Sequence, residues 1–448
     1  MGNEDKGNET TSGSITQPDV PLSGEAGVSS EQSRSDVAAK SARYCALAEQ
    51  AFISGGNFLL YVYAARTLPK DQWGTLSFAL ASLLVLQGFQ RAFVTVPMVT
   101  SGEKYSVFAG SLRFWRQMHG WVTGATLLLL LCFYVMARHY LEVWVAESVL
   151  LTTILVIPVY YMEFARRVVI MAFSMRRLLV MAAIYVFILF LAGAIVHRLG
   201  YDQHLWGFVV IIALAAIISC VSARVQLWPV WGQNTGGSWN IYSLWRFGRW
   251  AAASSLAYTG YNFAIQAILA AMAGPVALAV FAAARNLTQP VGTLIQAIDT
   301  VDKPRAGRAY AQQGTPGLWR IIRRSWAWLF ILALPYLALA SFFSQRLLVT
   351  IYGEKYSDDS TSVQLWCVVM IIMILVQPLE TGLYVIRRPD WLFYGRAISA
   401  GIILILTPWL IMNWSVNGAL VALATGWGLA GMVAAWLLVR LSHQVKRS

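Results

Sequence analysis

The sequence predicts an all-α, polytopic membrane protein with twelve transmembrane helices arranged as two six-helix lobes. Only 12% of its 448 residues are charged, about half the share in a typical soluble domain, and its mean hydropathy is +0.57. Its apolar runs are about 18–25 residues long, enough for a helix to cross the hydrocarbon of a bilayer. Lys and Arg avoid these runs and alternate in number between successive connections. The net charge of +13 therefore reflects basic membrane loops and does not indicate a nucleic-acid partner.

A polar tail at residues 1–40 comes first. It contains no aromatic residue and lacks the basic and apolar regions of a signal peptide, so we expect a disordered cytoplasmic segment. The N-terminal lobe is expected at 41–224 and the C-terminal lobe at 248–448. In chain order, the predicted helices cover 44–65, 74–98, 119–137, 147–165, 178–197, 205–224, 248–272, 276–300, 322–343, 363–385, 393–412 and 416–439.

Residues 225–247 connect the predicted lobes and are rich in tryptophan. Trp228, Trp231, Trp239 and Trp245 fall in this range. Tryptophan is enriched at the membrane–water interface because its ring is apolar and its N–H is polar. We therefore expect this linker to lie along the membrane surface.

The distribution of basic residues tests the number of helices. With the N-terminus in the cytoplasm, the cytoplasmic connections and termini hold 26 of the 34 Lys and Arg, and the opposite side holds six. A missed or additional helix would place basic connections on both sides of the membrane. The bias therefore favours twelve crossings with both termini in the cytoplasm.

Arg91 and Arg285 are the two basic residues placed well inside predicted helices. A charged side chain at the bilayer centre costs about 2.5–3.5 kcal/mol, so an arginine there indicates a functional site. Arg285 lies near the membrane midplane, whereas Arg91 lies closer to the cytoplasmic end, from which its side chain could also reach the interface. Because a guanidinium pairs with phosphate through two hydrogen bonds, both arginines are candidates for binding an anionic cargo.

Polar residues form stripes on several predicted helices, as expected for helices that face a common polar space. A shift of 205 residues superposes the stripe of the first helix on that of the seventh, which indicates a parallel repeat. Such residues also form hydrogen bonds between helices, so a cavity and a structural role both stay open. Beside the two arginines, the candidate substrate-binding residues are Asn57, Asn262, Gln266, Gln289 and Gln296.

Two carboxylates are candidates for ion coupling, and two others lie together in one connection. Glu49 and Glu380 lie one to two turns from the cytoplasmic ends of their helices, where each could carry a coupling ion or neutralise an arginine. Asp358 and Asp359 fall in the longest connection on the outer side, and we expect them to be solvated.

The sequence favours neither a metal site nor an enzyme. The four Cys are spread over separate apolar runs, the five His lack metal-ligand spacing and no P-loop occurs. We therefore expect no metal, no cofactor and no ATP hydrolysis. A membrane glycosyltransferase would need a catalytic loop that the short predicted connections do not provide.

Two hairpins carry a family resemblance. The first combines a Gly/Asn-containing helix, an Ala-Arg pair, a short turn and an aromatic-Gly pair, and the second follows a Gly-Pro turn. The motifs are Gly55-Gly56-Asn57-Phe58, Ala65-Arg66, Trp73-Gly74, Gly274-Pro275 and Ala284-Arg285. This pattern resembles Wzx-type polysaccharide flippases of the multidrug/oligosaccharidyl-lipid/polysaccharide exporter superfamily. Trp73 departs from it, since the family more often has Tyr or Phe there.

The resemblance implies alternating access between two lobes. It implies that undecaprenyl-diphosphate-linked oligosaccharide crosses the bacterial cytoplasmic membrane for surface or exopolysaccharide biosynthesis, with Arg285 first and Arg91 second on the diphosphate. A proton or sodium gradient, or the membrane potential, is expected to drive transport. Membrane lipids, a polysaccharide polymerase and export proteins are the other implied partners.

Other exporters of the superfamily, and a non-transporting scaffold, are the alternatives. A cation-coupled multidrug exporter would favour carboxylates in the cavity to bind organic cations. A lipid II flippase usually has fourteen helices and more cavity arginines. A structural scaffold would leave Arg285 without a role.

Overall fold

A computed structural model describes residues 45, 48–95, 97–98, 105–172, 175–231, 241–386 and 389–445. These ranges contain helices and no strand, as predicted. A helix at 48–67 comes first. The elements that follow are α2 (Lys70–Gln90), the π-helical turn η1 (Arg91–Thr95), α4 (Tyr105–Tyr140), α5 (Val143–Met171), α6 (Met175–Arg198), η2 (Tyr201–Gln203), α7 (Leu205–Trp231), α8 (Ile241–Phe342), α9 (Ser344–Tyr352), η3 (Glu354–Asp359), α10 (Ser360–Val385) and α11 (Pro389–Val445).

Two of these elements are bent into separate rods. α8 bends at Gly274 and Gly314, and α11 bends at Ser415. Divided at these bends, and with helix 48–67, the described rods correspond one by one to the predicted helices, apart from the short helix α9, which was not predicted. The number of membrane crossings and the side on which the termini lie stay predictions.

The helix surfaces are apolar over long distances. Among the described residues, eight helices are long and apolar enough to cross a membrane. Large apolar side chains stand out from them, including Leu129 at 71% exposure and Ile405 at 78%. Water would disfavour so many exposed apolar side chains, whereas lipid accommodates them. The chain is therefore a multi-pass membrane protein.

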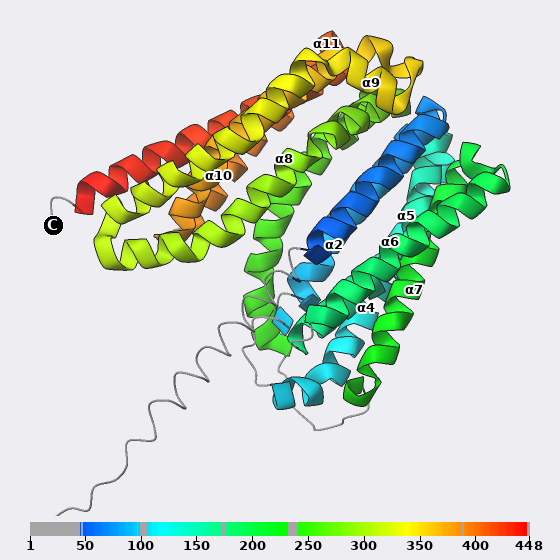
Figure 1. Cartoon of the computed structure of the whole chain (residues 1–448), viewed down its shortest axis with the longest axis horizontal. Helices are drawn as coiled ribbons and strands as arrows, with labels where there is room; N and C mark the ends of the chain where they lie inside the picture. Colours follow the sequence, from blue (N-terminus) through cyan, green and yellow to red (C-terminus); the bar gives the residue numbers. More distant parts are fainter. Residues whose placement is uncertain are drawn as a thin grey trace, which may run out of the picture.

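The helices form two groups. The N-lobe comprises helix 48–67 and the elements from α2 to α7, and the C-lobe comprises those from α8 to α11. Within the C-lobe α8, α10 and α11 pack on one another, and α2 packs on α8 between the lobes. Figure 1 shows the lobes converging where α9 and the start of α2 lie, and diverging toward the other end. We call the convergent end, with residues 66–74 and 344–359, the closed end, and the other the open end.

Several helices extend beyond the predicted ranges. α4 starts at Tyr105, and the second rod of α8 continues to Gln313 through most of the predicted 301–321 connection. Hydropathy detects only the part of a helix that lies in hydrocarbon, whereas the backbone hydrogen bonds continue into the polar region. α7 and α8 likewise enter the predicted linker, whose residues 232–240 lie outside the described residues, as does the tail at 1–40.

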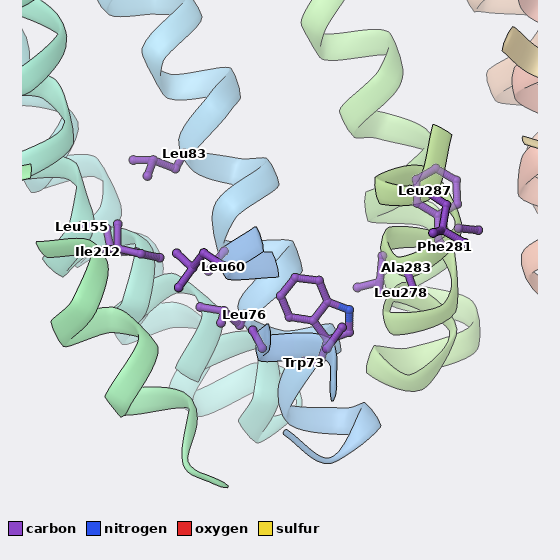
Figure 2. Close-up of a cluster of buried hydrophobic side chains, with 14 of the residues drawn as sticks. Leu60, Trp73, Leu76, Leu83, Leu155, Ile212, Leu278, Phe281, Ala283 and Leu287 are labelled. Carbon is purple, nitrogen blue, oxygen red and sulfur yellow. The ribbon is translucent and has the colours of Figure 1, made fainter. Parts of the chain in front are cut away.

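One cluster of buried apolar side chains joins the lobes near the closed end. It includes Leu60, Trp73 and Leu76 of the N-lobe together with Leu278 and Phe281 of α8. Figure 2 shows Trp73 between the two sets, with its indole nitrogen directed toward α8. This packing holds the start of α2 against the turn at Gly274, so the closed end is sealed by side chains as well as by backbone proximity.

Candidate functional site

A cavity of about 210 Å³ lies between the lobes, next to the closed end. Helix 48–67 and α2 form one wall, and α8 forms the other. Among the described residues that line it, Arg285 is the one charged residue. The polar side chains of the lining are Ser54, Asn57, Tyr61, Ser77, Gln266, Arg285, Asn286 and Gln289.

The position of Arg285 follows from the bend in α8. The second rod begins after Gly274, and eleven residues of helix place Arg285 about 16 Å along it. Gln289 lies one turn further on the same face. A guanidinium and a carboxamide at this spacing can donate together to one anionic group.

An aromatic wall faces this polar one. Phe58 and Tyr61 of helix 48–67 line the cavity with Trp73, and the centroids of the Tyr61 and Trp73 rings are 6.1 Å apart. Trp73 is only 2% exposed, and its indole N–H has no hydrogen-bond partner. The cavity therefore combines a cationic polar side with an aromatic side, which suits an amphipathic solute with an anionic group.

Asn286 links the cavity to the closed end. Its amide nitrogen donates a hydrogen bond to the hydroxyl of Tyr352 at 3.2 Å, and that hydroxyl donates to the carbonyl of Ala283 at 3.3 Å. Tyr352 is fully buried at the end of α9. The outermost turn of the cavity wall is thus tied to the segment that covers it.

The lobes are joined by polar contacts at the closed end. Lys70 of α2 forms an ion pair of 2.8 Å with Asp359 of η3. Arg66 donates to the carbonyls of Thr350 and Ile351 at 2.9 and 3.4 Å. Asp359 was predicted to be solvated with its neighbour Asp358. That prediction is wrong for Asp359, because α9 and η3 fold the connection back onto the opposite lobe.

Charged groups at the open end are paired within one lobe. Glu163 of α5 accepts from Arg91 at 3.2 Å, from Arg166 at 3.1 Å and from Arg167 at 2.9 Å. The Arg91 side chain is 44% exposed and starts the π-helical turn η1. Arg91 therefore lies in an ion-pair cluster, away from the residues that line the cavity.

Glu49 and Glu380 both neutralise arginines. Glu49 accepts two hydrogen bonds from Arg166, one of them at 2.9 Å. Glu380 of α10 is 1% exposed and pairs with Arg396 of α11, with one contact at 2.8 Å. Of the two roles left open for these carboxylates, charge neutralisation is the one visible in this conformation.

The remaining candidates separate. Asn57, Gln266 and Gln289 line the cavity with Arg285, and Asn57 also accepts a hydrogen bond from Tyr185 at 2.9 Å. Asn262 lies in a different pocket, between α8 and α11, and Gln296 is exposed about two turns beyond the last lining residue of α8. The matched stripes of the two halves therefore share the cavity only in part, since Asn57 and Gln266 line it and Asn262 does not.

Several lining residues, among them Asn286, Ser77 and Trp73, were not singled out from the sequence as substrate-binding candidates. Asn286 and Ser77 carried no pattern that distinguishes them from residues bonding between helices. Trp73 did carry a signal, since it departs from the resembling family at a hairpin position. Within the described residues no group of His, Cys, Asp and Glu is arranged to hold a metal ion.

Comparisons with known proteins identify the fold. Residues 251–410 match the sequence model of the MatE family. An inward-facing multidrug resistance MATE family transporter of the MOP superfamily is similar with a TM-score of 0.73 and 12% identity, over 89% of this chain and 96% of that one. A structure described as outward-facing gives a TM-score of 0.55 at 12% identity, over 90% and 94%. No curated protein sequence matches this chain.

A third similar structure differs in the chemistry of its pocket. It is a MOP superfamily transporter from Pyrococcus furiosus Vc1, with a TM-score of 0.62 and 12% identity over 89% of this chain and 94% of that one. It is described as having a binding pocket of reverse polarity, which suggests a different function.

This chain therefore has the fold of MATE transporters, which are not enzymes. The family model and the inward-facing structure are of the MATE type, whereas the hairpin motifs resemble polysaccharide flippases. Both agree on the fold, and neither determines the cargo.

Proposed function

We propose that this protein is a MATE-type exporter that moves amphipathic organic solutes across a membrane by alternating access. The observation that carries the proposal is the cavity between the lobes, sealed at one end by contacts between the lobes. At the other end, the ion pairs found among the described residues each stay within one lobe. A cavity sealed at one end, between two units that can rock, is the structural requirement for alternating access.

The conformation is consistent with loading from the cytoplasm. The TM-score is higher against the inward-facing transporter than against the outward-facing one, 0.73 against 0.55. The basic-residue bias predicts the open end to be cytoplasmic. We propose that this chain works as an exporter in a bacterial cytoplasmic membrane, taking up cargo at the open end.

The class of cargo has two candidates. The family match and the similar structures favour the multidrug class, to which the inward-facing relative belongs. Arg285, without a carboxylate among the described lining residues, favours an anionic solute over an organic cation, because a guanidinium attracts an anion and repels a cation. A lipid-linked oligosaccharide diphosphate is one such anion, and an anionic drug-like amphiphile is another.

Binding to the purified protein in detergent separates these candidates. Geranyl diphosphate serves as the anionic amphiphile and ethidium as the cationic one. We expect the wild type to bind geranyl diphosphate, and Arg285→Gln to weaken it about 10- to 150-fold, because hydrogen bonds to charged groups contribute about 1.5–3 kcal/mol. Arg138→Gln, at the exposed end of α4, is the matched control. The opposite result would favour cation export: the wild type binds ethidium and not geranyl diphosphate, and Arg285→Gln leaves ethidium binding unchanged or strengthens it.

We also propose that a proton or sodium gradient, or the membrane potential, drives transport, with Glu49 and Glu380 as candidate coupling groups. Each holds an arginine, so protonation or cation binding there would release a positive charge. In proteoliposomes, Glu380→Gln is expected to abolish transport driven by an imposed pH gradient while leaving cargo binding intact. Full gradient-driven transport by this variant would exclude Glu380.

A further inference from the structure

The segment formed by α9 and η3 lies between the cavity and the opposite lobe. Its first half ends at Tyr352, whose hydroxyl is held by Asn286 and Ala283 of α8. Gly353 follows with a φ of 95° and a ψ of 172°, a conformation open to glycine and strained for other residues. The chain thus turns abruptly at Gly353. The part before it contacts the cavity wall and, through Thr350 and Ile351, also Arg66 of the N-lobe, and the part after it contacts the N-lobe.

Three contacts fix the second half to the N-lobe. Lys355 donates to the carbonyl of Arg66 at 3.1 Å and to that of Leu68, and Asp359 pairs with Lys70. The Lys70 ammonium also lies 4.8 Å from the centre of the Tyr356 ring, which is fully buried. The hairpin between helix 48–67 and α2 is therefore held in place by hydrogen bonds and an ion pair from η3.

Asn286 belongs to both the cavity lining and this network. It follows Arg285 in the second rod of α8, lines the cavity, and donates its amide hydrogen bond to Tyr352. An anionic cargo on Arg285 presents acceptor oxygens beside that amide. A charged acceptor makes a stronger hydrogen bond with an amide than a tyrosine hydroxyl does, so the cargo competes for Asn286.

We propose that α9 and η3 form a cargo-sensing gate, in which cargo on Arg285 draws Asn286 away from Tyr352 and so loosens the grip of Lys355 and Asp359 on the opposite lobe. The inference rests on the proposed exporter function and adds the route by which occupancy of the cavity opens the closed end. Tyr352 and Asn286 act as positioning residues. Arg66, Lys70, Lys355 and Asp359 supply the polar contacts between the lobes that must break.

The two bulky side chains of the gate provide a matched pair of variants. Tyr352→Phe removes a hydroxyl that makes two hydrogen bonds. Tyr356→Phe removes a hydroxyl that is buried and has no hydrogen-bond partner, while keeping the ring beneath Lys70. The two rings lie 5.7 Å apart, so both variants probe the same packing environment.

Spin labels on both lobes report the gate. Tyr140→Cys on α4 and Phe342→Cys on α8 place labels at sites that are 82% and 83% exposed, in the full chain with its four native cysteines replaced. Distances between the labels are measured by pulsed electron resonance without ligand and with saturating geranyl diphosphate. In the wild type we expect the probe to lengthen the distance at the closed end.

Without ligand, Tyr352→Phe is expected to raise the ratio of the longer-distance to the shorter-distance population by about fivefold, which corresponds to the loss of one neutral hydrogen bond. The probe should then shift the distribution much less than in the wild type. Tyr356→Phe should behave as the wild type does in both conditions. A Tyr352→Phe variant with wild-type distances in both conditions would overturn the gate, as would identical effects of the two variants.

A charge reversal tests the contact with the other lobe. Lys70→Glu is expected to favour the longer distance without ligand, and Lys70→Glu combined with Asp359→Lys to restore the wild-type distribution. Because these measurements need no cargo, they separate the gate from the cargo assignment. A wild type that does not bind geranyl diphosphate contradicts the anionic cargo and with it the sensing step, while a failed rescue contradicts the grip between the lobes.

Discussion

Replacing Gly74 with alanine should open the closed end. A Cβ at Gly74 would lie 1.7 Å from the carbonyl oxygen of Pro275, where real Cβ atoms essentially never approach within 3.0 Å. The contact is with backbone, so no side chain can move aside and the start of α2 must separate from the turn of α8. Overpacking of this kind costs about 1–3 kcal/mol. Because the clash exists only while the lobes are together there, we expect the closed conformation to lose about 5- to 150-fold in population.

The assay is the reaction of a cysteine at Ser77, a cavity-lining position, with a membrane-impermeant maleimide applied from the side of the closed end. Gly74→Ala should raise the reaction rate by a factor comparable to the population shift. Gly55→Ala is the control, since a Cβ there meets no atom within 4 Å. If Gly74→Ala reacts as slowly as Gly55→Ala, the closed end is not held by close approach of the two backbones.

Three further outcomes follow from the paired charges. Arg91→Ala should lower stability by no more than about 1 kcal/mol and leave cargo binding unchanged, because the Arg91 side chain is 44% exposed and the buried Glu163 keeps two other arginines. A loss of cargo binding in a titration would restore Arg91 to the site. Glu380→Gln should lower the melting temperature far more than Arg91→Ala does, since it leaves Arg396 without its buried carboxylate, a change that costs about 3–5 kcal/mol. A melting temperature within a degree of wild type would contradict this. The hydrogen bond from His197 holds the pKa of Asp202 below the ordinary 3.8. The ionised Asp202 carboxylate therefore contributes to the free energy of unfolding above pH 3.8, and this contribution is lost as the pH falls through the lowered pKa. Asp202→Asn should accordingly be less stable than wild type from about pH 5 to 8, and the difference should shrink below about pH 4.

The sequence predicted the helices well because hydrocarbon imposes one solution on the backbone. A run of apolar residues in lipid must satisfy its own N–H and C=O groups, and a helix does so locally. The ends of the helices were predicted less well. Residues 301–313 are polar and still helical, since they lie beyond the apolar run and no hydropathy signal marks where the hydrogen bonding stops.

The cavity residues were predicted in part. Arg285 stood out because an arginine in an apolar run is costly unless it has a use, and helical phase then pointed to Gln289. The same reasoning could not separate Asn57 from Asn262, since both sit on polar stripes and only the packing of α11 on α8 decides which space each one faces. The ion pair of Arg91 could not be predicted from the sequence, because its partner Glu163 lies 72 residues away along the chain.

The polar contacts that join the lobes at the closed end are individually weak. Lys70 and Asp359 keep side-chain exposures of 24% and 22%, and pairs of that kind contribute no more than about 1 kcal/mol each. The buried pairs at the open end lie within single lobes, so they do not have to break when the lobes rock. A transporter needs two conformations of similar free energy. A ligand can change which conformation dominates only if its difference in binding free energy between the two is larger than the free-energy gap between them. Weak contacts between the lobes, combined with strong contacts within each lobe, provide that balance: the rigid units keep their shape while a single anionic cargo on Arg285 can decide which end is open.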